Sequence, residues 1–237
     1  MKRTTAVVIC WSWLCSPASA LVGDAPTAEW TIRRPAVMVY GARGRCSGVV
    51  LTQDLVLSAA HCVVISEKYN IFGHVGATPV RLADVTAIVP HPQFNREAKP
   101  GIADLSLLKL SNPLPSEFAP AFFDVRPVAI GDRMIVVGYG VAAGKDKKSF
   151  GTPRMATLTV SARTATLLML RDQTSNSIGS CFGDSGGPAF SIRGGVPALA
   201  GVVSAGNCDS VSIVIPSSPY RDWITETARK LGSALDR

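Results

Sequence analysis

The stretch CFGDSGGP, residues 181–188, places one serine among three glycines and an aspartate. A serine hydroxyl is a weak nucleophile at neutral pH. It needs a base within hydrogen-bond reach and a third group that orients the base. Ser185 is therefore a candidate nucleophile only if the chain also supplies a histidine and an acid. Without them the stretch is a glycine-rich turn.

The composition favours a β-rich globular protein. The chain has 237 residues, and 47% of them are hydrophobic, which is enough to build a core. Its 21 glycines and 16 prolines separate short runs rich in Val, Ile, Leu and Thr, a pattern typical of strands. The runs that we interpret as strands are Ala36–Tyr40, Cys46–Leu51, Leu55–Ala59, Val85–Val89, Leu105–Leu110, Pro127–Ile130, Met134–Gly138, Met155–Val160, Thr166–Leu170, Pro188–Ile192, Leu199–Val203 and Ser212–Ile215.

The C-terminal segment has a different pattern. From Tyr220 to Leu235 the apolar residues recur at helical spacing, so we expect one amphipathic helix over about 218–235 that packs on the body. Ser218 is the candidate N-cap and Pro219 the candidate first helical residue.

The first 20 residues have the features of a secretory signal peptide. Lys2 and Arg3 precede an apolar stretch, and the small residues 18–20 form a cleavage site. An N-terminal membrane anchor is the alternative interpretation. Cleavage after Ala20 would make Leu21 the first residue and leave no room for a propeptide. We therefore expect a secreted or periplasmic protein with no membrane contact after signal cleavage.

Removal of residues 1–20 would also change the cysteine count and the charge. Of the six cysteines it would leave Cys46, Cys62, Cys181 and Cys208. Four cysteines in an exported protein predict two disulfides, with three possible connectivities. The formal charge would fall from +7 to +5, because Lys2 and Arg3 leave. The basic run at 145–148 has no interleaved aromatic residues, so we interpret it as a solvated loop and expect no nucleic-acid partner.

The chain has three histidines, and one of them is a candidate base. His74 and His91 lie among glycines and prolines, so we expect both on surface turns or loops. His61 lies where a strand runs into small residues and Cys62. Asp104 opens an apolar strand, where a buried carboxylate would need a partner such as an imidazole N–H. A simple turn aspartate is the alternative for Asp104.

Three motifs in a fixed order carry a resemblance to a known family. SAAHC at 58–62, ADLSLLKL at 103–110 and CFGDSGGP resemble the trypsin–chymotrypsin family of serine proteases, and we take the chain for a bacterial-type member. HPQFN at 91–95 and VVGYG at 136–140 are similar to further landmarks of that family. GDSGG also fits the G-x-S-x-G pattern of the α/β-hydrolases, but in those enzymes the serine precedes the acid and the histidine.

The resemblance implies a fold and a domain organisation. We expect an all-β fold of two packed six-stranded antiparallel β-barrels, trypsin-like, with a C-terminal α-helix. The expected bounds are about 21–118 for the N-terminal barrel, 119–216 for the C-terminal barrel and 218–235 for the helix. The active site is expected in the crevice between the barrels.

The resemblance also assigns roles, residue by residue. Ser185 resembles the nucleophile, His61 the general base and Asp104 the carboxylate that orients it. The N–H groups of Gly183 and Ser185 resemble the oxyanion hole, and the amino group of Leu21 and Asp184 resemble an activation pair. The implied disulfides are Cys46–Cys62 and Cys181–Cys208. The implied substrate-binding residues are Gly179, Ser180, Phe182, Ser204, Gly206 and Ser212.

We therefore expect a secreted serine endopeptidase that acts on protein or peptide substrates as a monomer, without cofactor or metal. The alternatives are a catalytically silent homologue that binds partners, and an esterase or amidase with the same triad. Gly179 stands where relatives that cut after Arg or Lys carry a carboxylate, so we expect no preference for those residues unless Asp209 turns inward. We expect instead a medium to large apolar residue before the cut bond.

Overall fold

The computed structural model describes residues 21–235 except 24, 43, 77, 98–101, 143–145, 176 and 194. The predicted signal peptide, residues 1–20, lies outside the described residues. No helix in the described part of the chain has the length and apolar character needed to span a bilayer.

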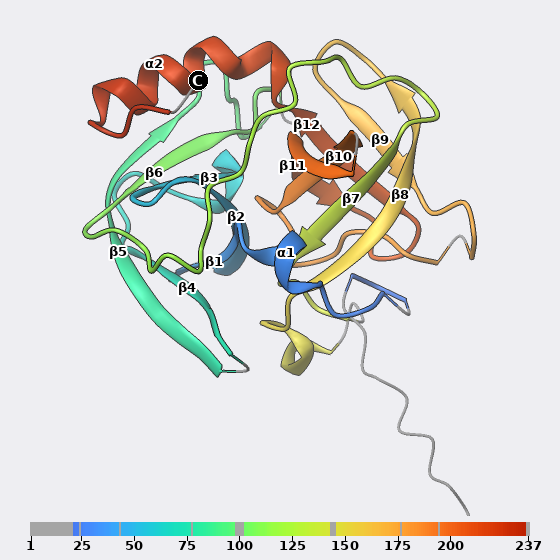
Figure 1. The fold of residues 1–237 in the computed structure, drawn as a ribbon, viewed down its shortest axis with the longest axis horizontal. Coiled ribbons are helices and arrows are strands. Elements are labelled where there is room, and N and C mark those ends of the chain that lie inside the picture. Colours follow the sequence, from blue (N-terminus) through green and yellow to red (C-terminus); the bar gives the residue numbers. More distant parts are fainter. Residues whose placement is uncertain are drawn as a thin grey trace, which may run out of the picture.

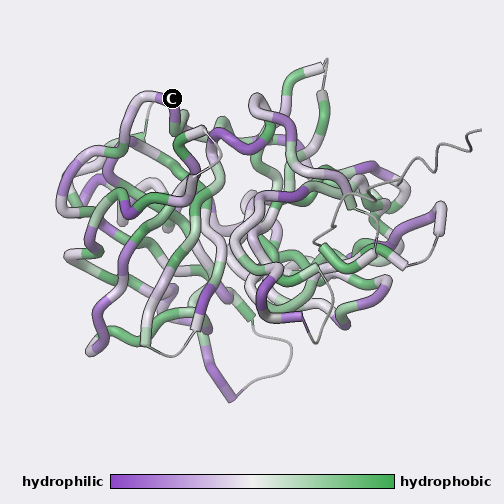
Figure 2. The backbone as a smooth tube through the Cα atoms, turned by 90° about the horizontal axis from the view of Figure 1, so that it is seen from below, coloured by the Kyte–Doolittle hydropathy of each residue, from purple (hydrophilic) through white to green (hydrophobic). Residues whose placement is uncertain are grey.

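Two closed six-stranded barrels lie side by side (Figures 1 and 2), as the resemblance implied. The strand order is β1-β2-β3-β6-β5-β4 in the first barrel and β10-β11-β12-β9-β8-β7 in the second, and all paired neighbours are antiparallel. The first barrel consists of β1 (Ala36–Gly41), β2 (Gly44–Thr52), β3 (Leu55–Ser58), β4 (Tyr69–Val75), β5 (Thr78–Pro90) and β6 (Ser106–Leu110). The second consists of β7 (Arg133–Gly138), β8 (Arg154–Arg163), β9 (Leu168–Arg171), β10 (Pro188–Arg193), β11 (Val196–Gly206) and β12 (Val211–Pro216).

Three apolar clusters hold this arrangement together. One fills the first barrel and one fills the second. The third lies between them and includes Met38 and Leu57 from the first barrel and Tyr139 and Phe190 from the second. Because the barrels share this cluster, the loops that meet at the seam are held in fixed relative positions.

Eleven of the twelve runs interpreted as strands overlap strands of the structure, and one does not. Pro127–Ile130 is irregular, although its composition is typical of a strand. The strand that was not anticipated is β4, which contains Asn70, Gly73 and His74. Alternate residues of β4 are buried, as in a strand with one face on the core. This alternation was the sequence signal for a strand, and the polar residues of the segment obscured it.

Two histidines are less exposed than the sequence predicted. His74 lies in β4, where its ring stacks on Tyr139 at a centroid distance of 5.8 Å. His91 is 8% exposed and contacts the rings of Tyr220 and Trp223 edge-on, at 5.1 and 4.7 Å. Burial lowers the pKa of both imidazoles. The expected loop position is right for His91, but the expected exposure is wrong there, and His74 lies half-buried in a strand where a turn was expected. Glycine and proline neighbours indicate local turns and carry no information on tertiary packing.

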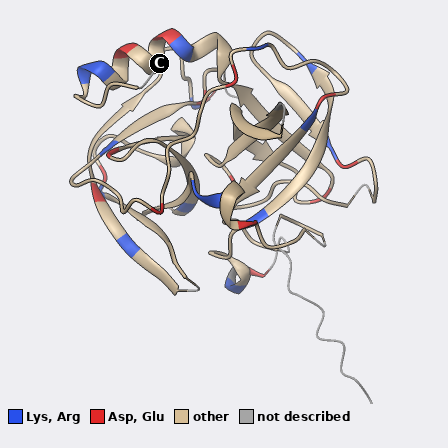
Figure 3. Cartoon of the chain, viewed as in Figure 1, with Lys and Arg blue, Asp and Glu red and all other residues tan. Residues whose placement is uncertain are grey.

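The C-terminal helix α2 (Arg221–Lys230) begins near the seam and runs over the first barrel beside β6, and Ile224 and Ala228 are buried in the shared cluster (Figure 1). A 3₁₀ turn, Ser218–Tyr220, precedes it, and no serine side chain caps either element. The expected N-cap role of Ser218 is therefore wrong. A second helix, α1 (Trp30–Arg33), is a single turn. Figure 3 shows acidic and basic residues scattered over both barrels and α2.

Candidate active site

The three candidate catalytic side chains come from three separate segments. His61 lies on a 3₁₀ turn, Ala60–Cys62, just after β3. Asp104 lies two residues before β6, and Ser185 lies in the turn that leads into β10. His61 and Ser185 both line a cleft of about 1210 Å³ at the seam between the barrels.

The carboxylate of Asp104 is bound to His61. Its Oδ2 lies 2.7 Å from Nδ1 of His61, and its Oδ1 accepts from the His61 backbone N–H at 2.8 Å. The Ser204 hydroxyl donates to Oδ2 at 2.6 Å. Burial alone raises the pKa of Asp104, but the hydrogen bonds from His61 and Ser204 outweigh it and hold that pKa below its ordinary value. An ionised Asp104 fixes the proton on Nδ1 and leaves Nε2 free to accept one.

The backbone just before Asp104 is in an unfavourable conformation. Ala103 is fully buried and has φ 51°, a region that non-glycine residues seldom occupy. The N–H of Leu105 donates to the Ala103 carbonyl at 2.7 Å, which closes a tight turn around Asp104. Such conformations cost on the order of 1–3 kcal/mol and persist only where the surrounding structure imposes them. This one places a carboxylate at the seam.

Ser185 is held from both barrels. Its carbonyl accepts from the Ser47 N–H at 2.8 Å, and the N–H of Gly186 donates to the Val203 carbonyl at 2.7 Å. Gly186 has φ +85°, and a Cβ there would lie 2.1 Å from the Ser47 carbonyl oxygen, so only glycine fits. The motif that surrounds the serine is thus in direct backbone contact with the first barrel.

The Ser185 hydroxyl does not reach His61 in this structure. It donates to the Ser204 carbonyl at 3.3 Å, and Nε2 of His61 lies 3.7 Å from the sulfur of Cys62. Catalytic hydrogen bonds in ligand-free sites are often long and tighten when substrate binds.

The N–H groups of Gly183 and Ser185 have no acceptor among the described residues, and both residues line the cleft. The Gly183 carbonyl accepts from the Ser47 hydroxyl at 2.8 Å. Gly183 has φ +98°, and a Cβ there would meet the Phe150 ring at 2.4 Å. Two residues that line the cleft thus each carry a backbone donor without a partner among the described residues.

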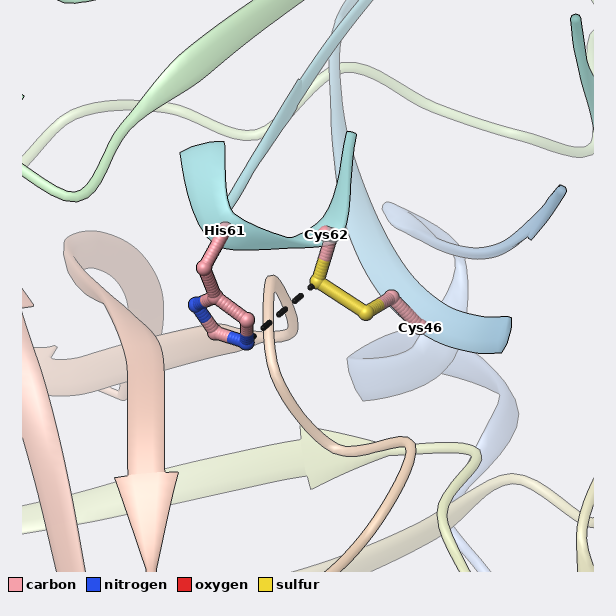
Figure 4. Close-up of side chains that lie close together, drawn as sticks. All are labelled: Cys46, His61 and Cys62. Atoms are coloured by element: carbon pink, nitrogen blue, oxygen red, sulfur yellow. Dashed lines mark hydrogen bonds between the residues drawn. A yellow bond between two sulfur atoms is a disulfide. The ribbon is translucent and has the colours of Figure 1, made fainter. Parts of the chain in front are cut away.

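Two disulfides connect the residues that the resemblance implied, Cys46–Cys62 and Cys181–Cys208. The first closes a loop with a sequence separation of 16 and fixes the backbone next to His61. In the chain-entropy account it stabilises the fold by about 3 kcal/mol. Figure 4 shows that the imidazole lies beside this disulfide. Metal ions bind thiolates, and the disulfide leaves neither sulfur in that form.

Asp184 is fully buried directly beneath the turn. Its Oδ1 accepts from the Gly140 N–H at 2.8 Å, and its Oδ2 accepts from the Cys181 N–H at 2.9 Å. Burial raises its pKa to about 7, although the two N–H groups and the charge of Arg154 act in the opposite direction. Leu21 is fully buried in the core of the second barrel, and the N–H of Val22 donates to the Gly179 carbonyl at 3.1 Å.

The structure places the six predicted substrate-binding residues in two groups. Phe182, Ser204 and Gly206 line the cleft. Gly179, Ser180 and Ser212 are buried and do not line it. Asp209 is exposed, and it does not line the cleft either.

Sequence reasoning missed several residues of the site. Ser47 is one, and its hydroxyl bridges the Gly183 carbonyl and the Tyr139 N–H. Arg96 is another, because its guanidinium donates to the carbonyls of His61 and Val63 at 3.0 and 2.9 Å. Arg45 and Lys148 also line the cleft, and no acidic residue in the described part of the chain does. No local pattern marks these residues, because the contacts depend on how the barrels meet.

Comparisons with known proteins agree with this geometry. The family described as Trypsin matches residues 26–224. Kallikrein-15 of Homo sapiens is 28% identical over 222 residues, covering 79% of this chain and 84% of that protein. A trypsin of Phaedon cochleariae is 29% identical over 206 residues, covering 76% and 78%.

Among solved structures, neuropsin, a serine protease expressed in mouse brain, superposes with a TM-score of 0.71 at 21% identity, covering 86% of this chain and 98% of that one. This likeness shows the fold. The relatives named here are eukaryotic, so the expectation of a bacterial-type member finds no support.

Proposed function

Because the chain belongs to the trypsin family, we propose that it is a secreted serine endopeptidase that uses Ser185, His61 and Asp104. The observation that carries the proposal is the bond of 2.7 Å between Asp104 and His61, in the same cleft as Ser185. Two disulfides are consistent with folding outside the cytosol. The proposed substrate is a protein or peptide, and the proposed acting form is a monomer.

The chemistry starts at Ser185. Its Oγ attacks the carbonyl carbon of the bond to be cut while Nε2 of His61 takes its proton. Asp104 stabilises the resulting imidazolium. The imidazolium then gives its proton to the leaving amine, and an acyl-enzyme remains on Oγ. Water, deprotonated by His61, hydrolyses the acyl-enzyme and regenerates Ser185.

The two unpaired N–H groups of Gly183 and Ser185 form the proposed oxyanion hole. The tetrahedral intermediate carries a negative charge on the former carbonyl oxygen, and fixed donors stabilise that charge without reorganisation. Ser47 supports this geometry, since it holds the Gly183 carbonyl with its hydroxyl and the Ser185 carbonyl with its N–H.

We expect the substitution Ser47→Ala to lower kcat about ten-fold with little change in KM. Loss of an oxyanion donor itself costs about 10²–10³ in kcat, and Ser47 only positions one. Steady-state kinetics on a peptide substrate measure the effect. The control is Ser217→Ala, which removes another fully buried serine hydroxyl, bonded to the Leu199 carbonyl outside the cleft. An unchanged kcat in Ser47→Ala would contradict the role given to Ser47.

Activation is proposed to follow from removal of residues 1–20. The new ammonium group of Leu21 pairs with Asp184, and the pair holds Gly183 and Ser185 in place. Two observations support this: Leu21 is already buried in the second barrel, and Asp184 has a pKa near 7 without an ammonium partner. Arg154 is the cation that faces Asp184, and it offsets only part of the effect of burial.

We compare a protein that begins at Leu21 with one that carries a single extra glycine before Leu21. We expect the first to be more active by about 10²-fold or more. The reason is that breaking a buried ion pair costs about 3–5 kcal/mol. Pairing raises the pKa of the amine above its free value of about 7.7–8.0. The contribution of the ammonium group to activity is therefore present below that value and is lost as pH rises through the raised pKa. Equal activity of the extended form, with its glycine verified by mass spectrometry, would contradict the mechanism.

A silent homologue and an esterase are the two competing functions. All three triad residues are present, and the Asp104–His61 pair is formed, which favours an enzyme. Rates on casein, peptide anilides and short esters separate a peptidase from an esterase. The proposal requires cleavage of casein, and hydrolysis of esters alone would support the esterase.

A further inference from the structure

The cleft stops where a deep pocket for the substrate side chain was expected. Two segments border that place, and we call them the first wall, residues 179–182, and the second wall, residues 204–208. The cleft is lined by Cys181 and Phe182 of the first wall and by Ser204, Ala205, Gly206 and Cys208 of the second. It does not extend to Gly179 or Ser180, the first two residues of the first wall.

The two walls touch each other through their backbones. The N–H of Cys208 donates to the Ser180 carbonyl at 3.1 Å. A Cβ on Gly206 would lie 2.0 Å from the Ser180 carbonyl oxygen, which shows how closely the second wall lies on the first. A side chain cannot enter between two backbones that are hydrogen-bonded to each other.

The space beneath the walls is filled as well. A Cβ on Gly179 would lie 2.8 Å from the backbone nitrogen of Val211. Ser180 and Ser212 are 1% and 0% exposed, and the Ser180 hydroxyl donates to that of Ser212 at 2.7 Å. The Ser212 hydroxyl also accepts from the Ser180 N–H at 2.9 Å, so the two serines are joined to each other beneath the walls.

The sequence explains why the walls are so close. Only Asn207 separates Gly206 from Cys208, and the disulfide to Cys181 holds the Cα atoms of its two cysteines 4.3 Å apart. The side-chain oxygen of Asn207 accepts from the N–H groups of Asp209, Ser210 and Val211 at 3.1, 2.9 and 2.9 Å. The short turn is thus closed by the disulfide and by one amide oxygen that three backbone N–H groups share.

We propose that the substrate residue before the cut bond is small, glycine or alanine. Its side chain would lie in the cleft, against the place where the two walls touch. The proposal rests on the proposed function, and it replaces the expectation of a medium to large apolar residue. A phenylalanine or arginine side chain there would have to break the Cys208–Ser180 bond or stay in solvent. The first case costs the contact between the walls, and the second leaves the side chain without burial.

The test uses phosphonate diphenyl esters of one peptide that differ only in the residue at the phosphorus, alanine, phenylalanine or arginine, each of which phosphonylates an activated serine. A small alkyl fluorophosphonate without such a residue runs beside them. We expect the alanine compound to inactivate about 10²-fold faster than the other two, which is the usual size of discrimination by pocket shape. A phenylalanine or arginine compound that reacts as fast as the alanine compound, or faster, would overturn the proposal.

The fluorophosphonate distinguishes failure of the small-residue proposal from failure of the proposed endopeptidase function. If it fails to label Ser185, the proposed function fails. If it labels Ser185 while the peptide compounds show no preference for alanine, or do not react at all, the proposed function stands and the small-residue proposal fails.

A widened variant tests the cause. Two glycines inserted between Gly206 and Asn207 would release the wall contact, and the same insertion after Gly131, an exposed turn residue with open space around it, is the control. The first variant should raise the phenylalanine-to-alanine rate ratio at least ten-fold, and the control should leave it unchanged. The fluorophosphonate rate shows that each variant is folded and active. An unchanged ratio in an active first variant would mean that the walls do not set the preference.

Discussion

Ser185→Ala is expected to reduce peptide hydrolysis by about 10⁶-fold in kcat, because the attacking oxygen is lost and no described neighbour replaces it. His61→Ala should cost about as much, and the double variant no more than either, since a triad acts as one unit. The initial rate on a peptide anilide at high enzyme concentration measures the loss. Additive losses in the double variant would mean that Ser185 and His61 act in separate steps.

The fold should survive Ser185→Ala. The contacts that hold residue 185 run through its carbonyl to Ser47, and the hydroxyl makes one long bond to the Ser204 carbonyl. The melting temperature should therefore shift by no more than a few degrees. A variant that keeps more than a small fraction of peptidase activity would show that Ser185 is not the nucleophile.

Asp104→Asn has the second largest expected effect, a loss of about 10⁴-fold in kcat, the size that this exchange has in a related triad. An amide can donate to Nδ1 of His61, and the imidazole then carries its proton on Nε2, where it cannot accept the serine proton. The matched control is Ser204→Ala, which removes one hydrogen bond to Oδ2 but keeps the carboxylate. It should lose far less activity. Equal losses in the two variants would contradict a role for the charge of Asp104.

The same carboxylate predicts a pH dependence of stability. Its pKa is lower in the folded protein than in the unfolded chain, so its contribution is fully present above the unfolded value of about 3.9. The contribution is lost as pH falls through the lowered pKa. Urea unfolding of Asp104→Asn and the parent protein should therefore differ most near neutral pH and converge in acid. A difference that grows in acid would contradict this reading.

The fold was predictable to a large extent, because most strands are short apolar runs between turn residues. The failures have physical reasons. Tyr69–Val75 forms β4 although Asn70 and Gly73 are poor strand formers, since its pairing with β1 and β5 supplies the hydrogen bonds. Pro127–Ile130 has strand composition but no partner strand. Tertiary pairing outweighs local propensity in both cases.

The site was predictable where chemistry needs a fixed residue type. His61, Asp104 and Ser185 lie in three motifs, and the family resemblance of these motifs implied their roles. The contact between the two walls could not be predicted from the sequence. It arises because the short turn is joined to the first wall by the disulfide and by the hydrogen bond to the Ser180 carbonyl. Ser47 was missed for a similar reason, since its partners Gly183 and Tyr139 lie in the other barrel.

The most direct test of the proposed mechanism is to label the protein that begins at Leu21 with a fluorophosphonate and to map the modified residue by peptide mass spectrometry. A fluorophosphonate reacts with a serine only if that serine is activated by a base. We expect stoichiometric modification of Ser185, abolished in His61→Ala and in protein unfolded before labelling. Modification of another residue, or no modification of a folded sample, would contradict it.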